Sequence, residues 1–245
     1  MKVYQTNEVK NIALIGGAKS GKTTIAEAML FEGGQINRRG TVDDKNTVSD
    51  YKQIEIERGN SVYASVLHAE YAGKKINIID TPGFHDFIGE TVEGLHAADI
   101  ALMMVNAQEG VQVGTEISWR LCNKLDKPLF FVLNQVDHEK VNIQETMTQL
   151  KSQFGDKVIA AVYPLNPGLE FNTLIDLIDM KMLKYPADGG KPEVLDIPAD
   201  EMGTAEDMHL ALVEAAAEGS EELMEKYFED GTLTPEEIRN GIRLG

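Results

Sequence analysis

Gly16-Gly17-Ala18-Lys19-Ser20-Gly21-Lys22-Thr23 is the stretch that decides the fold, because it matches the pattern G-x-x-x-x-G-K-S/T. It follows an apolar run, residues 12–15, and opens a helical pattern over residues 22–32. In this context glycines allow backbone N–H groups to converge on phosphate oxygens at a helix N-terminus. The stretch predicts a phosphate-binding loop, and a chance glycine-rich turn is the alternative.

The side chains of this loop have separate expected roles. Lys22 would bridge the terminal phosphates and supply the catalytic positive charge, and the Thr23 hydroxyl would ligate Mg²⁺. The other nucleotide contacts expected here come from Gly16, Lys19, Ser20, Gly21 and Thr24.

Outward from the loop, short β-branched apolar runs alternate with helical patterns. Strands are predicted at residues 11–15, 61–69, 75–79, 100–105, 129–133 and 158–163. Helices are predicted at residues 22–32, 87–97, 114–125 and 143–154. The alternation predicts an α/β fold with a mostly parallel central sheet and helices on both faces, and ligands at the carboxyl ends of the strands. Residues 33–60 are polar and long for a connection, which is typical of a functional or disordered loop.

After Phe171 the pattern changes. Segments 180–185 and 193–197 flank an Ala-Asp-Gly-Gly turn and predict a hairpin. Helices are predicted over 199–217 and 221–228, and a last one starts at Pro235 with Thr234 as its N-cap. The chain is therefore divided into a nucleotide-binding domain, residues 1–187, and an acidic, mainly helical inserted subdomain, residues 188–245.

Two further motifs follow predicted strands. Asp80-Thr81-Pro82-Gly83 places a carboxylate for Mg²⁺ and, at Gly83, an N–H for a γ-phosphate, whereas an ordinary turn is the alternative. Asn134-Gln135-Val136-Asp137 fits N-x-x-D, in which the Asp137 carboxylate accepts hydrogen bonds from a guanine edge. A helix N-cap at Asp137 is the alternative. Together the three motifs predict a site for GTP or GDP with Mg²⁺.

The net charge and the cysteine content exclude some classes of function and of covalent structure. The net charge is −17, and residues 188–245 hold 16 acidic and 4 basic side chains. Such a surface excludes nucleic-acid binding through bulk charge and is either a solvated helical face or a docking face for a basic partner. The single cysteine, Cys122, excludes an intrachain disulfide. With no signal peptide or membrane-length apolar run, a cytoplasmic protein without a membrane contact is expected.

The motifs resemble those of translational GTPases. Glu57-Arg58-Gly59-Asn60-Ser61 is similar to E-R-G-I-T, which places Ser61 at the Mg²⁺-binding threonine of the family. The segment 80–87 is similar to D-T-P-G-H-V-D-F, and segments 171–181, 197–199 and 222–227 resemble elongation factor G and its helical insertion. The resemblance implies a GTP-binding (G) domain, and a chain that stops before the last strand, the last helix and the later domains of the factor.

Four residues depart from the family pattern. Phe84 stands at the position of the catalytic histidine, and Asn60 replaces an apolar gate residue. Lys19 replaces a phosphate-loop aspartate, and Gln135 replaces the lysine of N-K-x-D. The first two predict slow or absent GTP hydrolysis, whereas the last two affect binding. His85 is adjacent to Phe84 and is the candidate substitute for the missing histidine.

The resemblance implies a monomeric, ribosome-dependent factor that promotes translocation. It would contact the ribosomal stalk protein through the acidic insertion and ribosomal RNA through the nucleotide-site face. Two alternatives stay open. One is a ribosomal-protection factor with the same motifs, and the other is a non-hydrolysing GTP-binding module that acts by occupying the ribosome.

Overall fold

The computed structural model of the chain describes residues 3–187 and 189–245. It divides into two compact units, one up to Gln135 and one from Val136 onward, and each is described by itself. Asp188, at which the predicted inserted subdomain begins, lies outside the described residues.

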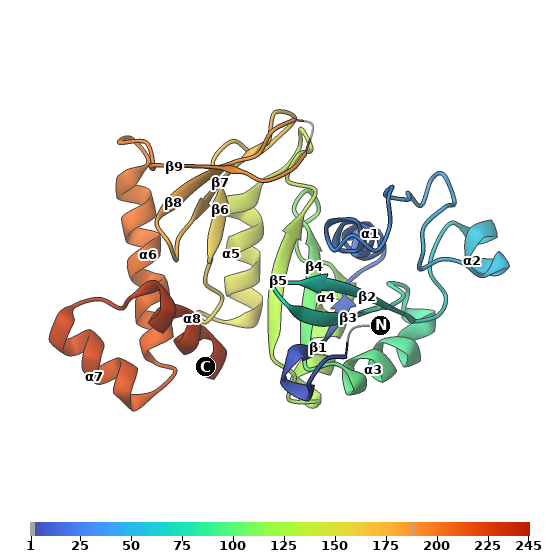
Figure 1. The fold of residues 1–245 in the computed structure, drawn as a ribbon, viewed down its shortest axis with the longest axis horizontal. Coiled ribbons are helices and arrows are strands. Elements are labelled where there is room, and N and C mark those ends of the chain that lie inside the picture. Colours follow the sequence, from blue (N-terminus) through green and yellow to red (C-terminus); the bar gives the residue numbers. More distant parts are fainter. Residues whose placement is uncertain (1–2, 188) are drawn as a thin grey trace. The chain divides into compact units, whose positions relative to one another are not determined.

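The first unit is built on a five-stranded sheet with the order β2-β3-β1-β4-β5 (Figure 1). Its strands are β1 (Val9–Ile15), β2 (Ser65–Tyr71), β3 (Lys74–Asp80), β4 (Ile100–Asn106) and β5 (Leu129–Asn134). All neighbours pair in parallel except β2, which runs antiparallel to β3 at one edge. The predicted, mostly parallel sheet is therefore confirmed.

Both faces of this sheet are covered by helices, because the buried side chains of β1 alternate between two cores. Ile12 and Leu14 pack in one core with Ala26 of α1 (Lys22–Glu32). Ala13 and Ile15 pack in the other, which includes side chains of α3 (Ile88–Ala97) and α4 (Val113–Lys124). The carboxyl ends of β1, β3, β4 and β5 then reach one edge of the sheet, and the three sequence motifs follow those ends.

The connection from α1 to β2 is more ordered than its composition indicates. It includes α2 (Gln53–Arg58), a helix that was not predicted within the polar stretch 33–60. Strand β2 starts at Ser65, four residues later than predicted, since residues 61–64 still belong to this connection. Short 3₁₀ helices, η1 (Thr6–Glu8) and η2 (His85–Phe87), precede β1 and α3.

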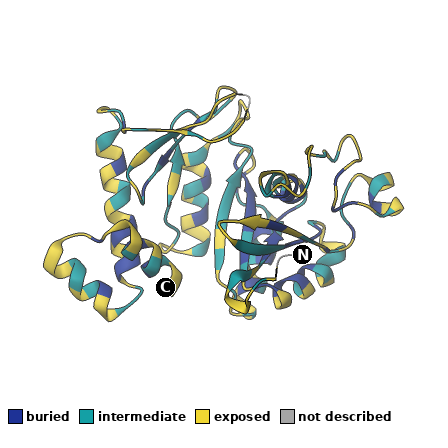
Figure 2. Cartoon of the chain, viewed as in Figure 1, coloured by how far each residue is buried: buried dark blue, intermediate teal, exposed yellow. Residues whose placement is uncertain are grey.

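The second unit contains an antiparallel sheet with the order β6-β7-β8-β9. Its elements are α5 (Ile143–Phe154), β6 (Val162–Pro164), β7 (Thr173–Asp176), β8 (Lys181–Lys184), β9 (Glu193–Leu195), α6 (Met202–Ala217), α7 (Glu221–Asp230) and α8 (Pro235–Leu244). Its core joins Ile175 and Leu177 of the sheet region to Leu212, Leu223 and Ile238 of the three last helices. The outer residues of α6 and α7 are exposed (Figure 2).

This unit confirms the predicted hairpin and the three C-terminal helices. The Thr234 hydroxyl caps α8 by accepting a hydrogen bond from the Glu237 N–H. The predicted strand 158–163 is wrong in extent, since only Val162–Pro164 is a strand. It pairs antiparallel with β7, a strand that was not predicted. Among the described helices, none combines the length and the apolar character that crossing a membrane requires.

Candidate functional site

The phosphate loop connects β1 to α1 and depends on backbone conformations that glycine tolerates. Gly16 and Gly21 have φ angles of 128° and 92°, in the left-handed region. A Cβ on Gly21 would also lie 2.0 Å from Nδ2 of Asn134, closer than any real carbon contact. A side chain at position 21 would therefore push the loop away from the end of β5.

Lys22 is the buried cation of this loop. Its side chain is only 6 % exposed, and Nζ donates hydrogen bonds to the carbonyl oxygens of Gly16 at 3.0 Å and Gly17 at 2.7 Å. Burial lowers the pKa of Lys22 to about 8, against the opposing pull of Asp80. Gly83 lies next to it, since a Cβ on Gly83 would be 2.6 Å from the same Nζ. Phosphate charge at this point would raise the pKa of Lys22 again.

Oxygen atoms of Thr23, Ser61 and Asp80 gather beside Lys22. The Thr23 hydroxyl donates to Oδ2 of Asp80 at 2.8 Å and lies 3.4 Å from Oγ of Ser61. The other carboxylate oxygen of Asp80, Oδ1, is buried and has no partner with hydrogen-bond geometry among the described residues, although the Ser49 side chain lies near the carboxylate. Burial raises the pKa of Asp80 to about 6, opposed by Thr23 and Lys22.

Asp50 is a site residue that the sequence analysis missed. It is buried, its Oδ1 also lacks a hydrogen-bond partner among the described residues, and burial raises its pKa while a hydrogen bond from Ser61 lowers it. Hard divalent cations take oxygen ligands, and an unpartnered carboxylate oxygen is the group that such an ion would satisfy. The two acids and two hydroxyls therefore fit Mg²⁺. In the sequence, Asp50 is an isolated aspartate in a polar stretch, and no motif marks it as a metal ligand.

The third motif is attached to the phosphate loop through two amides. Nδ2 of Asn134 donates to the carbonyl oxygen of Ser20, and Nε2 of Gln135 donates to that of Lys19, both at 3.0 Å. Asp137 is exposed in the second unit, within a turn. Helix α5 is capped by Asn142, whose side chain accepts from the Glu145 N–H. The alternative interpretation of Asp137 as a helix N-cap is therefore wrong.

Phe84 and His85, at the predicted hydrolytic position, are exposed, whereas Asn60 is partly buried. Phe84 is 42 % exposed and immediately precedes η2. The ring of His85 turns toward the first turn of α4, where its Cε1 lies 3.8 Å from the point that a Cβ on Gly114 would occupy. Asn60 donates through Nδ2 to the carbonyl oxygen of Arg58 at 3.2 Å, and its Oδ1 is buried without a described partner.

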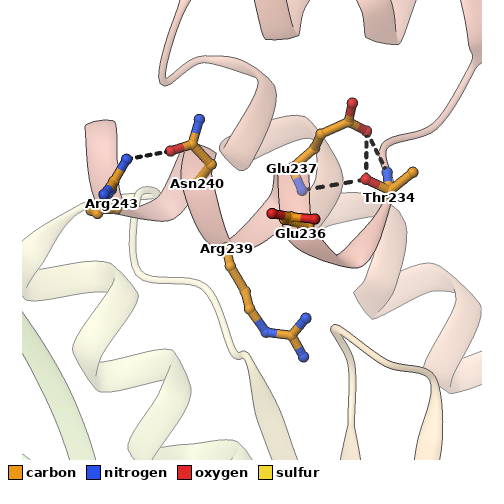
Figure 3. Close-up of a pocket in the computed structure, with 6 residues that line it drawn as sticks. All are labelled: Thr234, Glu236, Glu237, Arg239, Asn240 and Arg243. Carbon is orange, nitrogen blue, oxygen red and sulfur yellow. Dashed lines mark hydrogen bonds between the residues drawn. The ribbon is translucent and has the colours of Figure 1, made fainter. Parts of the chain in front are cut away.

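A separate hollow of about 570 Å³ lies along α8 in the second unit (Figure 3). It is lined by Thr234, Glu236, Glu237, Arg239, Asn240 and Arg243. Both arginines are already engaged, Arg239 with Asp179 and Arg243 with Asn240. None of the nucleotide-motif residues lines this hollow.

Comparison with known proteins gives concordant results. The family described as "Elongation factor Tu GTP binding domain" matches residues 7–235. An "Elongation factor G-like protein" of Thermotoga maritima is 32 % identical over 237 residues, which are 97 % of this chain and 33 % of that protein. A crystal structure from Thermus thermophilus has a TM-score of 0.89 at 32 % identity and covers 97 % of this chain and 36 % of its own. The chain thus spans about a third of the length of these relatives.

Proposed function

The chain belongs to the family of the elongation factor Tu GTP-binding domain, and from this we propose that it binds GTP and GDP with Mg²⁺ as the nucleotide module of an elongation factor G-like translation factor. The observation that carries the proposal is the attachment of two motifs to one loop. The Thr23 hydroxyl donates a hydrogen bond to Asp80, and the Asn134 side-chain amide donates one to the Ser20 carbonyl oxygen. The metal motif and the base motif therefore both contact the phosphate loop.

In this proposal the phosphate chain lies along the backbone N–H groups that open α1, whose dipole favours negative charge. The Lys22 ammonium stabilises the charge on the terminal phosphates. Thr23, Ser61 and Asp80 would hold Mg²⁺, with Asp50 beside them, and the ion would neutralise phosphate charge when bound. The N–H of Gly83 orients a γ-phosphate. These roles are supported by the burial of Lys22, Thr23, Asp50 and Asp80. They are also supported by the hydrogen bond from Thr23 to Asp80 and by the 3.4 Å approach of Thr23 to Ser61.

Base selection is assigned to Asp137. Its carboxylate would accept hydrogen bonds from the guanine edge, at which adenine presents a different pattern. Asn134 and Gln135 would hold the base loop against the phosphate loop, which their hydrogen bonds to Ser20 and Lys19 support.

Slow or absent hydrolysis is part of the proposal. Phe84 has no hydrogen-bonding atom and cannot orient or deprotonate a water at the γ-phosphate. This residue, together with Asn60, favours a second candidate function, a GTP-binding module that acts by occupancy without turnover.

The partners proposed are ribosomal. The acidic helices α6 and α7 would meet the stalk protein, and the nucleotide-site face would meet ribosomal RNA, in a monomeric, cytoplasmic factor that promotes translocation. A ribosomal-protection factor is the alternative with the same motifs.

The test is calorimetric titration of the full chain with GTP, GDP and ATP, in Mg²⁺ and in EDTA. The proposal expects binding of both guanine nucleotides, strengthened by Mg²⁺, and much weaker binding of ATP. Thr23→Ala should remove the Mg²⁺ effect, whereas Thr148→Ala, an exposed threonine on α5, should leave it intact. Equal affinity of the wild type for ATP and GTP would overturn the assignment.

A further inference from the structure

The buried carboxylate of Glu27 joins the two ends of a loop, residues 40–48. We call these two ends, Gly40 and Val48, the neck of the loop. Glu27 lies on α1 and is only 1 % exposed. Its Oε2 accepts a hydrogen bond from the Gly40 N–H at 2.8 Å, and its Oε1 accepts one from the Val48 N–H at 2.6 Å. One side chain therefore binds both ends of the loop and attaches them to α1.

The loop is also tied within itself. The Thr41 N–H donates to Oδ1 of Asn46 at 2.7 Å, and the Asn46 N–H donates back to the Thr41 carbonyl at 3.4 Å. Gly40 packs so closely on this turn that a Cβ on it would lie 2.4 Å from the Asn46 carbonyl oxygen. The closed neck therefore has no space for a side chain at position 40.

The residues after the neck lead directly into the proposed cation site. Ser49 and Asp50 follow Val48, and the Ser49 carbonyl accepts a hydrogen bond from the Ser65 hydroxyl at 2.8 Å. The Ser61 hydroxyl lies near enough to Asp50 to lower the pKa of its carboxyl, and it lies 3.4 Å from the Thr23 hydroxyl. Glu27 stands four positions after Thr23 on α1, about one turn along the same helix. One helix thus carries the phosphate-binding end and the anchor of the loop.

We propose that Glu27 is a positioning residue for the cation site: by closing the neck of the loop 40–48 it holds Asp50 and Ser61 where Mg²⁺ binds beside Thr23 and Asp80. It touches neither nucleotide nor metal in this role. The inference rests on the proposed function, since it assigns the support of the same Mg²⁺ site.

Two variants open the neck from opposite sides. Glu27→Gln keeps the size of the side chain but offers an NH₂ group to one of the two N–H donors, so at least one hydrogen bond to a charged acceptor is lost. Gly40→Ala leaves α1 unchanged and introduces the Cβ that would clash with the Asn46 carbonyl oxygen. Glu93→Gln, at an exposed glutamate on α3, is the charge-matched control.

The first measurement is limited trypsin digestion of the nucleotide-free full chain, followed by mass spectrometry. Cleavage after Arg38, Arg39 and Lys45 should be about tenfold faster in Glu27→Gln and Gly40→Ala than in the control. The double variant should be no faster than either single variant, because both act on one neck.

The second measurement is the Mg²⁺ concentration that half-saturates retention of a fluorescent GDP. It should rise by about tenfold in both variants, while the GDP affinity in EDTA stays close to that of Glu93→Gln. A purely structural role would lower the EDTA affinity and leave the Mg²⁺ requirement unchanged.

Unchanged trypsin cleavage and an unchanged Mg²⁺ requirement in both variants would overturn the proposal. If the wild type itself binds no guanine nucleotide, the proposed function fails, and the role of Glu27 at the cation fails with it. In that case the digestion still decides whether the carboxylate closes the neck.

Discussion

The side-chain amide of Gln135 donates a hydrogen bond to the carbonyl oxygen of Lys19 over 3.0 Å. Both residues have positive φ angles, 60° and 62°, in the left-handed region. In translational GTPases, which this chain resembles, a lysine at the position of Gln135 supports the phosphate loop. Here an amide makes that connection at the same end of β5.

The first prediction concerns this amide. Gln135→Ala should weaken GDP binding by about threefold to tenfold, the range expected for one net hydrogen bond. Gln135→Lys should restore most of the affinity. Fluorescent GDP titration measures both, with Gln153→Ala, at an exposed glutamine on α5, as the control. Wild-type affinity in Gln135→Ala would show that Asn134 alone holds the loop.

The second prediction concerns base selection. Asp137→Asn should lower GTP affinity by about tenfold or more and raise the affinity for xanthosine triphosphate, because a carboxylate acceptor becomes partly a donor. Competition of the two nucleotides for one labelled GDP complex gives the ratio. Asp156→Asn, an exposed aspartate after α5, should change neither affinity. A variant with unaltered preference would remove Asp137 from the base site.

The third prediction concerns turnover. In the full-length protein on ribosomes, single-turnover GTP hydrolysis should be slow, and Phe84→His should accelerate it by roughly 10²–10⁴-fold, the usual effect of a positioned proton-handling group. Phe228→His, at a phenylalanine that is 77 % exposed, is the matched control. A wild type already as fast as Phe84→His would contradict this, and slowing of that wild type by His85→Ala would assign the task to His85.

The fourth prediction concerns the acidic helices. Reversing the charges of three exposed glutamates on α7 should slow stalk-dependent association and reduce its salt sensitivity. These glutamates are Glu221, Glu222 and Glu225. The control reverses three exposed acids elsewhere, Glu70, Glu93 and Asp156. Circular dichroism checks α7, since two of the reversed charges lie in its first turn. Equal kinetics in both triple variants would leave these acids as a solvated surface only.

The fifth prediction concerns pH. Hydrogen bonds from Lys226 and then Thr234 lower the pKa of Glu237 from 4.5 to about 2. Because the folded-state pKa is depressed, the stabilisation is complete above about pH 4.5 and is lost as pH falls toward 2. Urea unfolding of wild type and Glu237→Gln should therefore differ at pH 5 and converge near pH 2. For the control variant Glu236→Gln, the difference in unfolding free energy from wild type should not shrink in this way between pH 5 and pH 2. If wild type and Glu237→Gln still differ at pH 2, the ionised Glu237 is not the origin of the stabilisation.

The sequence predicted the elements whose apolar pattern and end signals agree. Helix α1 begins at Lys22 and ends at Glu32 as expected, because a glycine loop precedes it and glycines follow it. Thr234 and Pro235 likewise marked the start of α8. Helix α2 was missed because its residues, QIEIER, lie in a polar stretch and are stabilised by tertiary contacts. Glu55 is buried and accepts N–H bonds from Val62 and Tyr63.

The candidate site was predictable where residues adjacent in sequence act together. The phosphate loop and Asp80 each stand in a local motif, so spacing was enough to find them. Asp50 and Glu27 are isolated in sequence, and their positions depend on how the segment 40–48 folds back on α1. Strand β6 was misassigned for a related reason, since a short apolar run does not specify which sheet it joins.

The burial of Lys22 and Asp80, together with the proposed nucleotide binding, predicts that the stability of the chain depends on ligand supply. Burial disfavours the charged form of both side chains, as the pKa values of about 8 and about 6 record. In the proposed function, phosphate and a divalent cation would bind only where these groups are assembled, which is in the folded chain and not in the unfolded one. By mass action, ligand at 100 times its dissociation constant adds about 2.7 kcal/mol to the free energy of unfolding. The melting temperature of this protein should therefore follow the concentration of nucleotide around it.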